Sequence, residues 1–173
     1  MKTFTFGCII ILFSMLSHAQ KPLVIEAWNQ KWQNSKQYLI EVAQAMPESE
    51  YDFKPVPDEM SFGEQMKHIV GNVSWLSSSF IVKQENPFPK ELIAKAKTKA
   101  EIIKMVGNVF DFAYQSVQTV TSTNLSEEVD FFVKPTNKLQ ILNLLQDHQT
   151  HHRAQVIVYL RLKGIKPPSY RGW

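Results

Sequence analysis

Cysteine is nearly absent from this sequence of 173 residues, in which Cys8 is the one residue of its type. Cys8 lies in an N-terminal segment that we expect to be removed, and the mature chain would then contain no thiol. Disulfide bonds and thiolate metal ligands are thereby excluded from the mature protein. Any bound metal ion must be held by histidine, carboxylate or water.

A strong charge of either sign is also lacking. The chain has 19 basic and 16 acidic side chains, which gives a formal net charge of +3. Loss of Lys2 with the leader leaves 18 basic against 16 acidic side chains, or +2. The two signs alternate along the chain without forming blocks, and this pattern is not typical of a nucleic-acid-binding surface.

The N-terminal apolar run, from Phe4 to Leu16, is shorter than the roughly 20 residues that a membrane-spanning helix requires. It follows Lys2 and precedes Ser17-His18-Ala19, which has the small-x-small pattern of a signal-peptide cleavage site. We therefore predict that residues 1–19 are a secretory signal peptide. The protein is expected to be exported, to the periplasm or the extracellular space, without a stable membrane anchor. Residues 20–173 have the size of one domain.

Helical periodicity characterises most of residues 20–173. In residues 23–46, Trp28 and Trp32 share one helix face with other apolar residues and are expected in the core, and Pro47 ends this segment. The stretches 61–64 (SFGE) and 98–101 (TKAE) are capping boxes, whose first and fourth side chains satisfy backbone donors at a helix start. They predict two further helices, over about 61–83 and 98–120.

The last helix is expected to begin after Thr136 or Asn137 and to reach Lys163, because Gly164 and two prolines follow. Before it, the strand-like fragment from Val129 to Val133 is too short to build a sheet on its own. Four amphipathic helices without a competing strand pattern predict an all-α fold, an antiparallel four-helix bundle with long first and third connections.

The last predicted helix contains the sequence DHQTHHRAQ, residues 147–155, in which three histidines fall within five residues. At about 100° per residue, His148 and His152 lie about 40° apart, whereas His148 and His151 lie about 60° apart in the other direction. The apolar residues of this helix place His152 inside the buried arc and His151 at its edge. The inward pair is therefore His148 and His152. The side chains expected to face solvent are Asp147, Thr150, Arg153 and Arg161.

Two interpretations of this pair are open at this point. The histidines can be core residues that form hydrogen bonds to neighbouring helices, or they can be metal ligands, since HxxxH is a recurrent metal-binding spacing. The mature sequence has one further histidine, His68, near the start of the second predicted helix. Asn72 and Trp75 share its helix stripe, which is typical of a partly hydrated pocket wall and also of an exposed flank.

His68 follows the Ser61 cap by seven residues, the proline-containing stretch YDFKPVPDEMSFGEQMKH leads into it, and HQTHHRAQ lies in the last helix. With these features, residues 23–168 resemble the DinB-like, or YfiT-like, family of metal-binding four-helix bundles. The resemblance implies a divalent ion, zinc or nickel, held by His68, His148 and His152, with open positions filled by water. Ala154 stands where the family often has glycine. A fourth protein ligand is not evident, and Asp58, Glu59 and Glu64 stay open for that position.

The resemblance further implies a metal-dependent hydrolase or a thiol-dependent transferase that acts on a small molecule, with metal-bound water as the expected nucleophile. Asn72 and Trp75 are expected to line the pocket. Export disfavours the thiol reaction, because small thiols are scarce outside the cytoplasm. The alternative is a non-catalytic protein that holds a metal or a small ligand. No nucleic-acid partner is expected, while Ile157, on the outward side of the last helix, suggests a homodimer.

Overall fold

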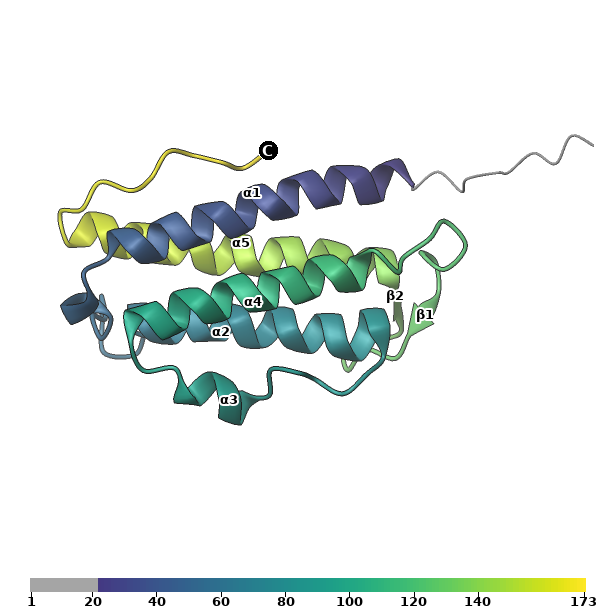
Figure 1. Ribbon diagram of the computed structural model, residues 1–173, viewed down its shortest axis with the longest axis horizontal. Coiled ribbons are helices and arrows are strands. Elements are labelled where there is room, and N and C mark those ends of the chain that lie inside the picture. Colours follow the sequence, from purple (N-terminus) through teal and green to yellow (C-terminus); the bar gives the residue numbers. More distant parts are fainter. Residues whose placement is uncertain (1–21) are drawn as a thin grey trace, which may run out of the picture.

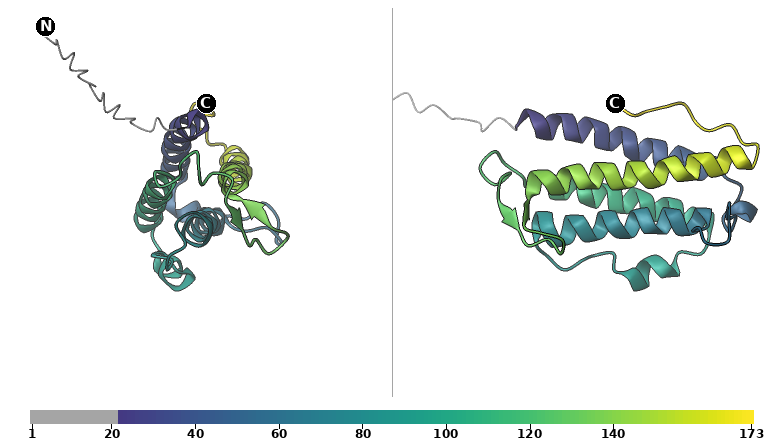
Figure 2. Two further views of the ribbon diagram at one scale, coloured as in Figure 1. Left: turned by 90° about the vertical axis from the view of Figure 1, so that its right-hand side faces the viewer. Right: turned by 180° about the vertical axis from the view of Figure 1, so that it is seen from behind.

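Four long helices lie side by side in the computed structural model, which describes residues 22–173 (Figures 1 and 2). They are α1 (Leu23–Ala45), α2 (Phe62–Leu76), α4 (Lys99–Val117) and α5 (Lys138–Leu162). Helices α2 and α4 run in one direction and α1 and α5 in the other (Figure 1). Each of α2 and α1 packs against both α4 and α5. The predicted all-α four-helix bundle is confirmed, whereas the predicted signal peptide lies outside the described residues.

The helix starts follow from local hydrogen bonding. Complete capping boxes begin α2 at Ser61, α4 at Thr98 and α5 at Asn137, the second of the two residues considered for that cap. In each box the cap side chain accepts from a backbone N–H, and the fourth residue accepts from the cap's own N–H. Helix α2 continues as the π-helical segment η2 (Ser77–Val82), and Lys83 ends it in the left-handed region with φ of 53°.

The connections contain short elements that the sequence pattern did not predict. A 3-10 turn, η1 (Glu48–Glu50), follows α1, and the short helix α3 (Lys90–Lys95) precedes α4. Strands β1 (Glu128–Val129) and β2 (Thr136–Asn137) pair antiparallel. The expectation of a strand from Val129 to Val133 was therefore wrong in extent, because residues 130–135 are needed to reverse the chain between the two strands.

Aromatic stacking anchors α1 to α4. Trp28, Trp32 and Phe110 stack in sequence with ring centroids 4.6 Å apart at each step. The indole Nε1 of Trp32 donates to the backbone oxygen of Phe110 at 2.9 Å, so this buried polar group is satisfied. Both tryptophans are buried, which confirms their predicted place in the core.

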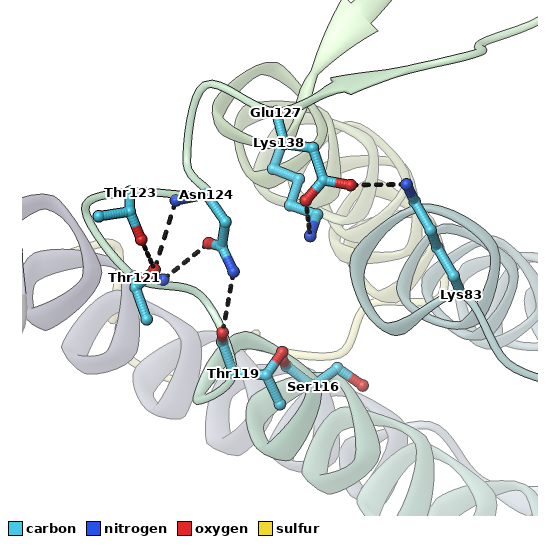
Figure 3. Close-up of polar contacts among 8 residues, drawn as sticks. All are labelled: Lys83, Ser116, Thr119, Thr121, Thr123, Asn124, Glu127 and Lys138. Atoms are coloured by element: carbon cyan, nitrogen blue, oxygen red, sulfur yellow. Dashed lines mark hydrogen bonds and ion pairs between the residues drawn. The ribbon is translucent and has the colours of Figure 1, made fainter.

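Glu127 joins the end of η2 to the start of α5 (Figure 3). Its two carboxylate oxygens accept from Lys138 Nζ at 2.7 Å and Lys83 Nζ at 2.6 Å. These two bonds, the one from Lys138 above all, lower the pKa of Glu127 to about 2. The contact holds the ends of two long helices together at the end of the bundle where the β1–β2 hairpin lies. Among residues 22–173, no helix has the length and apolar character needed to cross a lipid bilayer.

Candidate metal centre

Three histidines meet where α2 packs against α5. His68 comes from α2, and His148 and His152 come from successive turns of α5. Their ring centroids are 4.4 to 4.9 Å apart, and one ring nitrogen of each lies within 4.8 Å of the other two. The structure therefore brings together the three residues that the sequence resemblance implied as ligands, and this group can hold a metal ion. It includes no carboxylate from the described part of the chain.

The distance between two of these nitrogens suits shared coordination. His68 Nε2 and His148 Nε2 are 3.1 Å apart. Two nitrogens that bind one zinc ion at its usual bond length are separated by about 3.0 to 3.4 Å, depending on whether the angle at the metal is octahedral or tetrahedral. The two imidazoles thus have a spacing that a divalent ion can bridge with little rearrangement.

Gln65 determines which nitrogen of His152 is free. Its side-chain Oε1 lies 2.7 Å from His152 Nδ1. An amide oxygen can only accept, so His152 Nδ1 must carry the proton and donate it to this bond. In the neutral ring, Nε2 then has the lone pair that a metal requires. A ligand histidine whose second nitrogen donates to a fixed acceptor is the usual arrangement around protein-bound metals.

The same hydrogen-bond chain continues beyond Gln65. Gln65 Nε2 donates to Gln155 Oε1 at 2.6 Å, and Gln155 Nε2 donates to His151 Nε2 at 2.9 Å. At each step of this chain the donated hydrogen bond points away from His152 and toward His151. His151 is exposed and contributes to the site through this chain rather than as a member of the three-histidine group.

Burial keeps the three imidazoles in the neutral form. It is the main cause that lowers the pKa of His148 to about 4, with smaller effects from the other histidines nearby. Burial also lowers the pKa of His152 to about 4, and it lowers the pKa of His68. Neutral imidazole is the form that binds metal, so protons compete weakly for these nitrogens near neutral pH.

The stability of the metal-free protein is expected to fall as the pH is lowered from about 6.5 to about 4.5. In this range the unfolded histidines, with a pKa near 6.5, take up protons, whereas folded His148 and His152 do not until about pH 4. Protons therefore favour the unfolded state. Carboxylates whose pKa is lowered in the folded state reduce the stability only below about pH 4.5, where they begin to take up protons in the unfolded chain.

Urea unfolding at several pH values, in the presence of a chelator, measures this effect. The double variant His148→Gln/His152→Gln is the control, because it removes both groups and should give a flatter profile. Parallel profiles for the two proteins would show that these histidines are not held neutral by the fold.

Replacement of Gln65 by leucine is expected to weaken metal binding by about 10- to 100-fold, the usual effect of losing a partner that orients a ligand. Leucine cannot accept from His152 Nδ1, and the proton is then free to occupy either nitrogen. Titration with zinc under a competing chelator measures the affinity. Gln155→Leu is the matched control, because it cuts the chain one step later and leaves the bond from His152 to Gln65 intact. Equal losses in both variants would contradict the assigned role of Gln65.

The helix phase predicted for α5 was partly wrong. Leu142, Gln149, Arg153 and Leu160 are buried. At about 100° per residue, they lie about 100° to 140° from His148, so the buried arc is centred about 90° away and both ligand histidines are on its flank. The apolar pattern alone missed this, because α5 contacts α1 as well as α2 and part of its second buried face is polar.

Arg153 is the clearest correction. It was expected to face solvent but is only 4% exposed. Its Nη1 donates to Gln149 Oε1 at 2.8 Å, and the guanidinium lies 5.1 Å from the centre of the Tyr38 ring. This cation–π contact and hydrogen bond hold the side chain against α1, away from the three histidines. Asp147, Thr150 and Arg161 are exposed as predicted.

A cavity of about 610 Å³ adjoins His68 on α2. Asn72 and Trp75, the two residues expected to line a pocket, are both part of its wall. The opposite wall comes from residues 86–94, which include most of α3. The sequence pattern does not predict this wall, because it does not predict α3. It also does not single out Gln65 or Gln155, although each lies one turn from a ligand histidine, at the i−3 or i+3 position.

Comparisons with known proteins agree with this fold. The model of the DinB family matches residues 15–172. The protein YjoA of Bacillus subtilis strain 168 is 23% identical over 127 residues, which cover 72% of this chain and 80% of the relative. The crystal structures of DinB-like YjoA and of a DinB-like protein from Bacillus cereus ATCC 10987 have TM-scores of 0.70 and 0.69. They are 19% and 22% identical to this chain, and each comparison covers 84% of it and 97% of the other chain. The resemblance seen in the sequence is thus confirmed, and the chain belongs to the DinB family.

Proposed function

We propose that this protein binds a divalent metal, zinc or nickel, through His68, His148 and His152 and uses it on a small-molecule substrate. The observation that carries the proposal is the meeting of three imidazoles from two helices, with His68 Nε2 and His148 Nε2 3.1 Å apart. Three protein ligands leave further coordination positions open, which is typical of catalytic rather than structural zinc.

A divalent ion held there would act as a Lewis acid toward water, a thiol or a carbonyl oxygen. The residues of the chain do the remaining work. Gln65 holds the proton on His152 Nδ1 and so leaves the lone pair of the neutral ring on Nε2. Burial keeps the imidazoles neutral, and the cavity beside His68 offers room for a substrate. The reaction proposed is metal-dependent hydrolysis or a thiol-dependent transfer.

Export by the predicted signal peptide, residues 1–19, is part of the proposal and favours hydrolysis, since small thiols are scarce outside the cytoplasm. A homodimer is also proposed, but Ile157 does not support it, because this residue packs against the core. Val158 and Leu162, which are exposed on α5, are the better candidates for such an interface.

A screen of ester, amide and thiol-plus-electrophile substrates, with metal-loaded and metal-free protein, tests the catalytic function. Turnover that needs metal and is lost in His148→Ala supports an enzyme. Silence in every class, with the metal bound, would favour the second candidate, a protein that holds a metal or a small ligand without turnover. The cavity beside His68 is the observation that favours this second function.

A further inference from the structure

The cavity of about 610 Å³ between α2 and the segment that contains α3 is largely apolar inside. Trp75 and Gly71 come from α2, and Phe88, Ile93 and Ala94 come from the opposite segment. Figure 1 shows α3 lying alongside α2 on the outer side of the bundle. The volume is within the range of about 300 to 1,000 Å³ that is common for small-molecule sites.

Gly71 helps to keep this space open. A Cβ atom at this position would meet only Ile93 Cδ1, at 3.7 Å, which is ordinary van der Waals contact. The helix could therefore accept a side chain here, and a large one would extend into the cavity. The absence of a side chain at Gly71 thus leaves room between α2 and α3 that a ligand can use.

Two lysines contribute positive charge to the wall of the cavity. Lys67 and Lys90 both line it, and neither forms an ion pair with another residue in the range 22–173. The one acidic residue of the lining, Glu64, is already engaged by the backbone N–H of Ser61 at 2.7 Å and by Lys54 at 3.4 Å. Lys67 has a weak electrostatic interaction with Glu101. No acidic residue in the range 22–173 holds Lys67 or Lys90 in an ion pair, so both can approach an anionic group on a ligand.

The wall also contains an unused hydrogen-bond acceptor. Asn72 Oδ1 is buried and has no hydrogen-bond partner among the described residues. By contrast, the other amide in the lining, Asn86, accepts from Ser74 Oγ and from the backbone N–H of Phe88. Buried polar atoms in folded proteins are normally satisfied. Rotation of the Asn72 side chain would bring Oδ1 to the cavity, where it could accept from a donor on a ligand.

We propose that this cavity binds an amphipathic organic anion that has an aromatic or aliphatic body. The body packs on Trp75, Phe88 and Ile93, the anionic group lies toward Lys67 and Lys90, and an N–H or O–H donates to Asn72 Oδ1. Because the cavity and the metal centre share His68, this names the ligand class for the small-molecule role proposed above, on which the inference rests.

Two fluorescent probes with one skeleton test the proposal. They are 8-anilino-1-naphthalenesulfonate, which is anionic, and N-phenyl-1-naphthylamine, which lacks the sulfonate; both carry an N–H. Titration of chelator-treated protein is expected to show tighter binding of the sulfonate. The double variant Lys67→Gln/Lys90→Gln should lower the affinity for the sulfonate probe by about tenfold, as expected for the loss of two solvent-accessible ion pairs. It should leave the affinity for the neutral probe unchanged. Since no metal is present, a failure of the metal centre does not affect this result.

Variants that fill the cavity locate the probe. Gly71→Phe on α2 and Ala94→Trp on α3 should each lower the affinity for both probes by at least tenfold. If Gly71→Phe does not fold, Ala94→Trp gives the same test from the opposite wall. The competing apolar surface is Phe132, which is 79% exposed with its ring 6.1 Å from that of Trp75. Phe132→Ser is expected to leave binding unchanged. The proposal is overturned if Phe132→Ser removes binding, if the filling variants do not, or if the two probes bind equally well.

Discussion

His148→Ala and His152→Ala are each expected to lower the affinity for divalent metal by more than about 100-fold. This exceeds the loss of about 10- to 100-fold that is usual when only a residue that orients a ligand is removed. The reason is direct: each variant removes one of three nitrogens that lie within 4.8 Å of one another. His68→Ala should have the same effect, although this residue is eighty positions away in the sequence. Equilibrium dialysis or calorimetry with zinc and nickel measures the loss.

His151→Ala is the matched control, because it removes a histidine from the same stretch of α5. His151 is exposed and only accepts from Gln155, so its loss should change the affinity by less than the loss of Gln65. Helix content checked by circular dichroism separates loss of the site from loss of the fold. If His151→Ala abolishes binding while His148→Ala does not, the assignment of ligands is wrong.

Trp32→Ala is expected to lower the free energy of unfolding by about 3 to 5 kcal/mol, as is usual for a buried tryptophan replaced by alanine. The side chain is fully buried, stacks between Trp28 and Phe110, and donates to the Phe110 backbone oxygen. The variant leaves a cavity at the α1–α4 contact and removes the hydrogen bond from the indole to the Phe110 backbone oxygen. Because a domain is commonly stable by only about 5 to 15 kcal/mol, this loss should be close to unfolding the protein.

Urea unfolding followed by circular dichroism measures the change without using tryptophan fluorescence. The free energy of unfolding of Trp32→Phe should lie between those of the wild type and Trp32→Ala, since phenylalanine keeps most of the stacking but lacks the N–H donor. Trp173→Ala, at an exposed tryptophan, should change the free energy of unfolding by less than about 0.5 kcal/mol. A loss below about 1 kcal/mol for Trp32→Ala would contradict its central place in the core.

Helix boundaries were predictable where a side chain caps the backbone. Ser61, Thr98 and Asn137 begin helices as predicted, since the capping interaction depends on residues three positions apart. Capping does not predict α3, because this helix has only six residues and no side-chain cap. Its position depends on packing against α2 through Ile93, a contact between segments that are distant in the sequence.

The choice of histidines was predictable, but their surroundings were not. The spacing of His148 and His152 brings them to one side of α5 whatever the neighbouring helices do. Which side is most deeply buried depends on two helix contacts at once, and Arg153 shows the difficulty. A charged residue is buried there because Gln149, one turn earlier on α5, and Tyr38 on α1 compensate it, and the contact with Tyr38 cannot be identified from the pattern of α5 alone.

The position of Gln65 illustrates the same limit at the scale of single atoms. Gln65 lies one turn before His68 on α2, yet the hydrogen bond that it accepts from His152 joins residues 87 positions apart. Only the packing of α2 on α5 brings the two together. Once they meet, the rule that an amide oxygen accepts determines the protonated nitrogen of His152, and the site acquires a defined ligand atom.

The metal content of the purified mature protein tests the central claim most directly. The protein is loaded with zinc or nickel, freed of excess ion by desalting and analysed by plasma mass spectrometry. Three converging neutral imidazoles predict about one equivalent of metal per chain. Less than about 0.1 equivalent after such loading would contradict the three-histidine metal centre, because a site of this kind retains its ion through desalting.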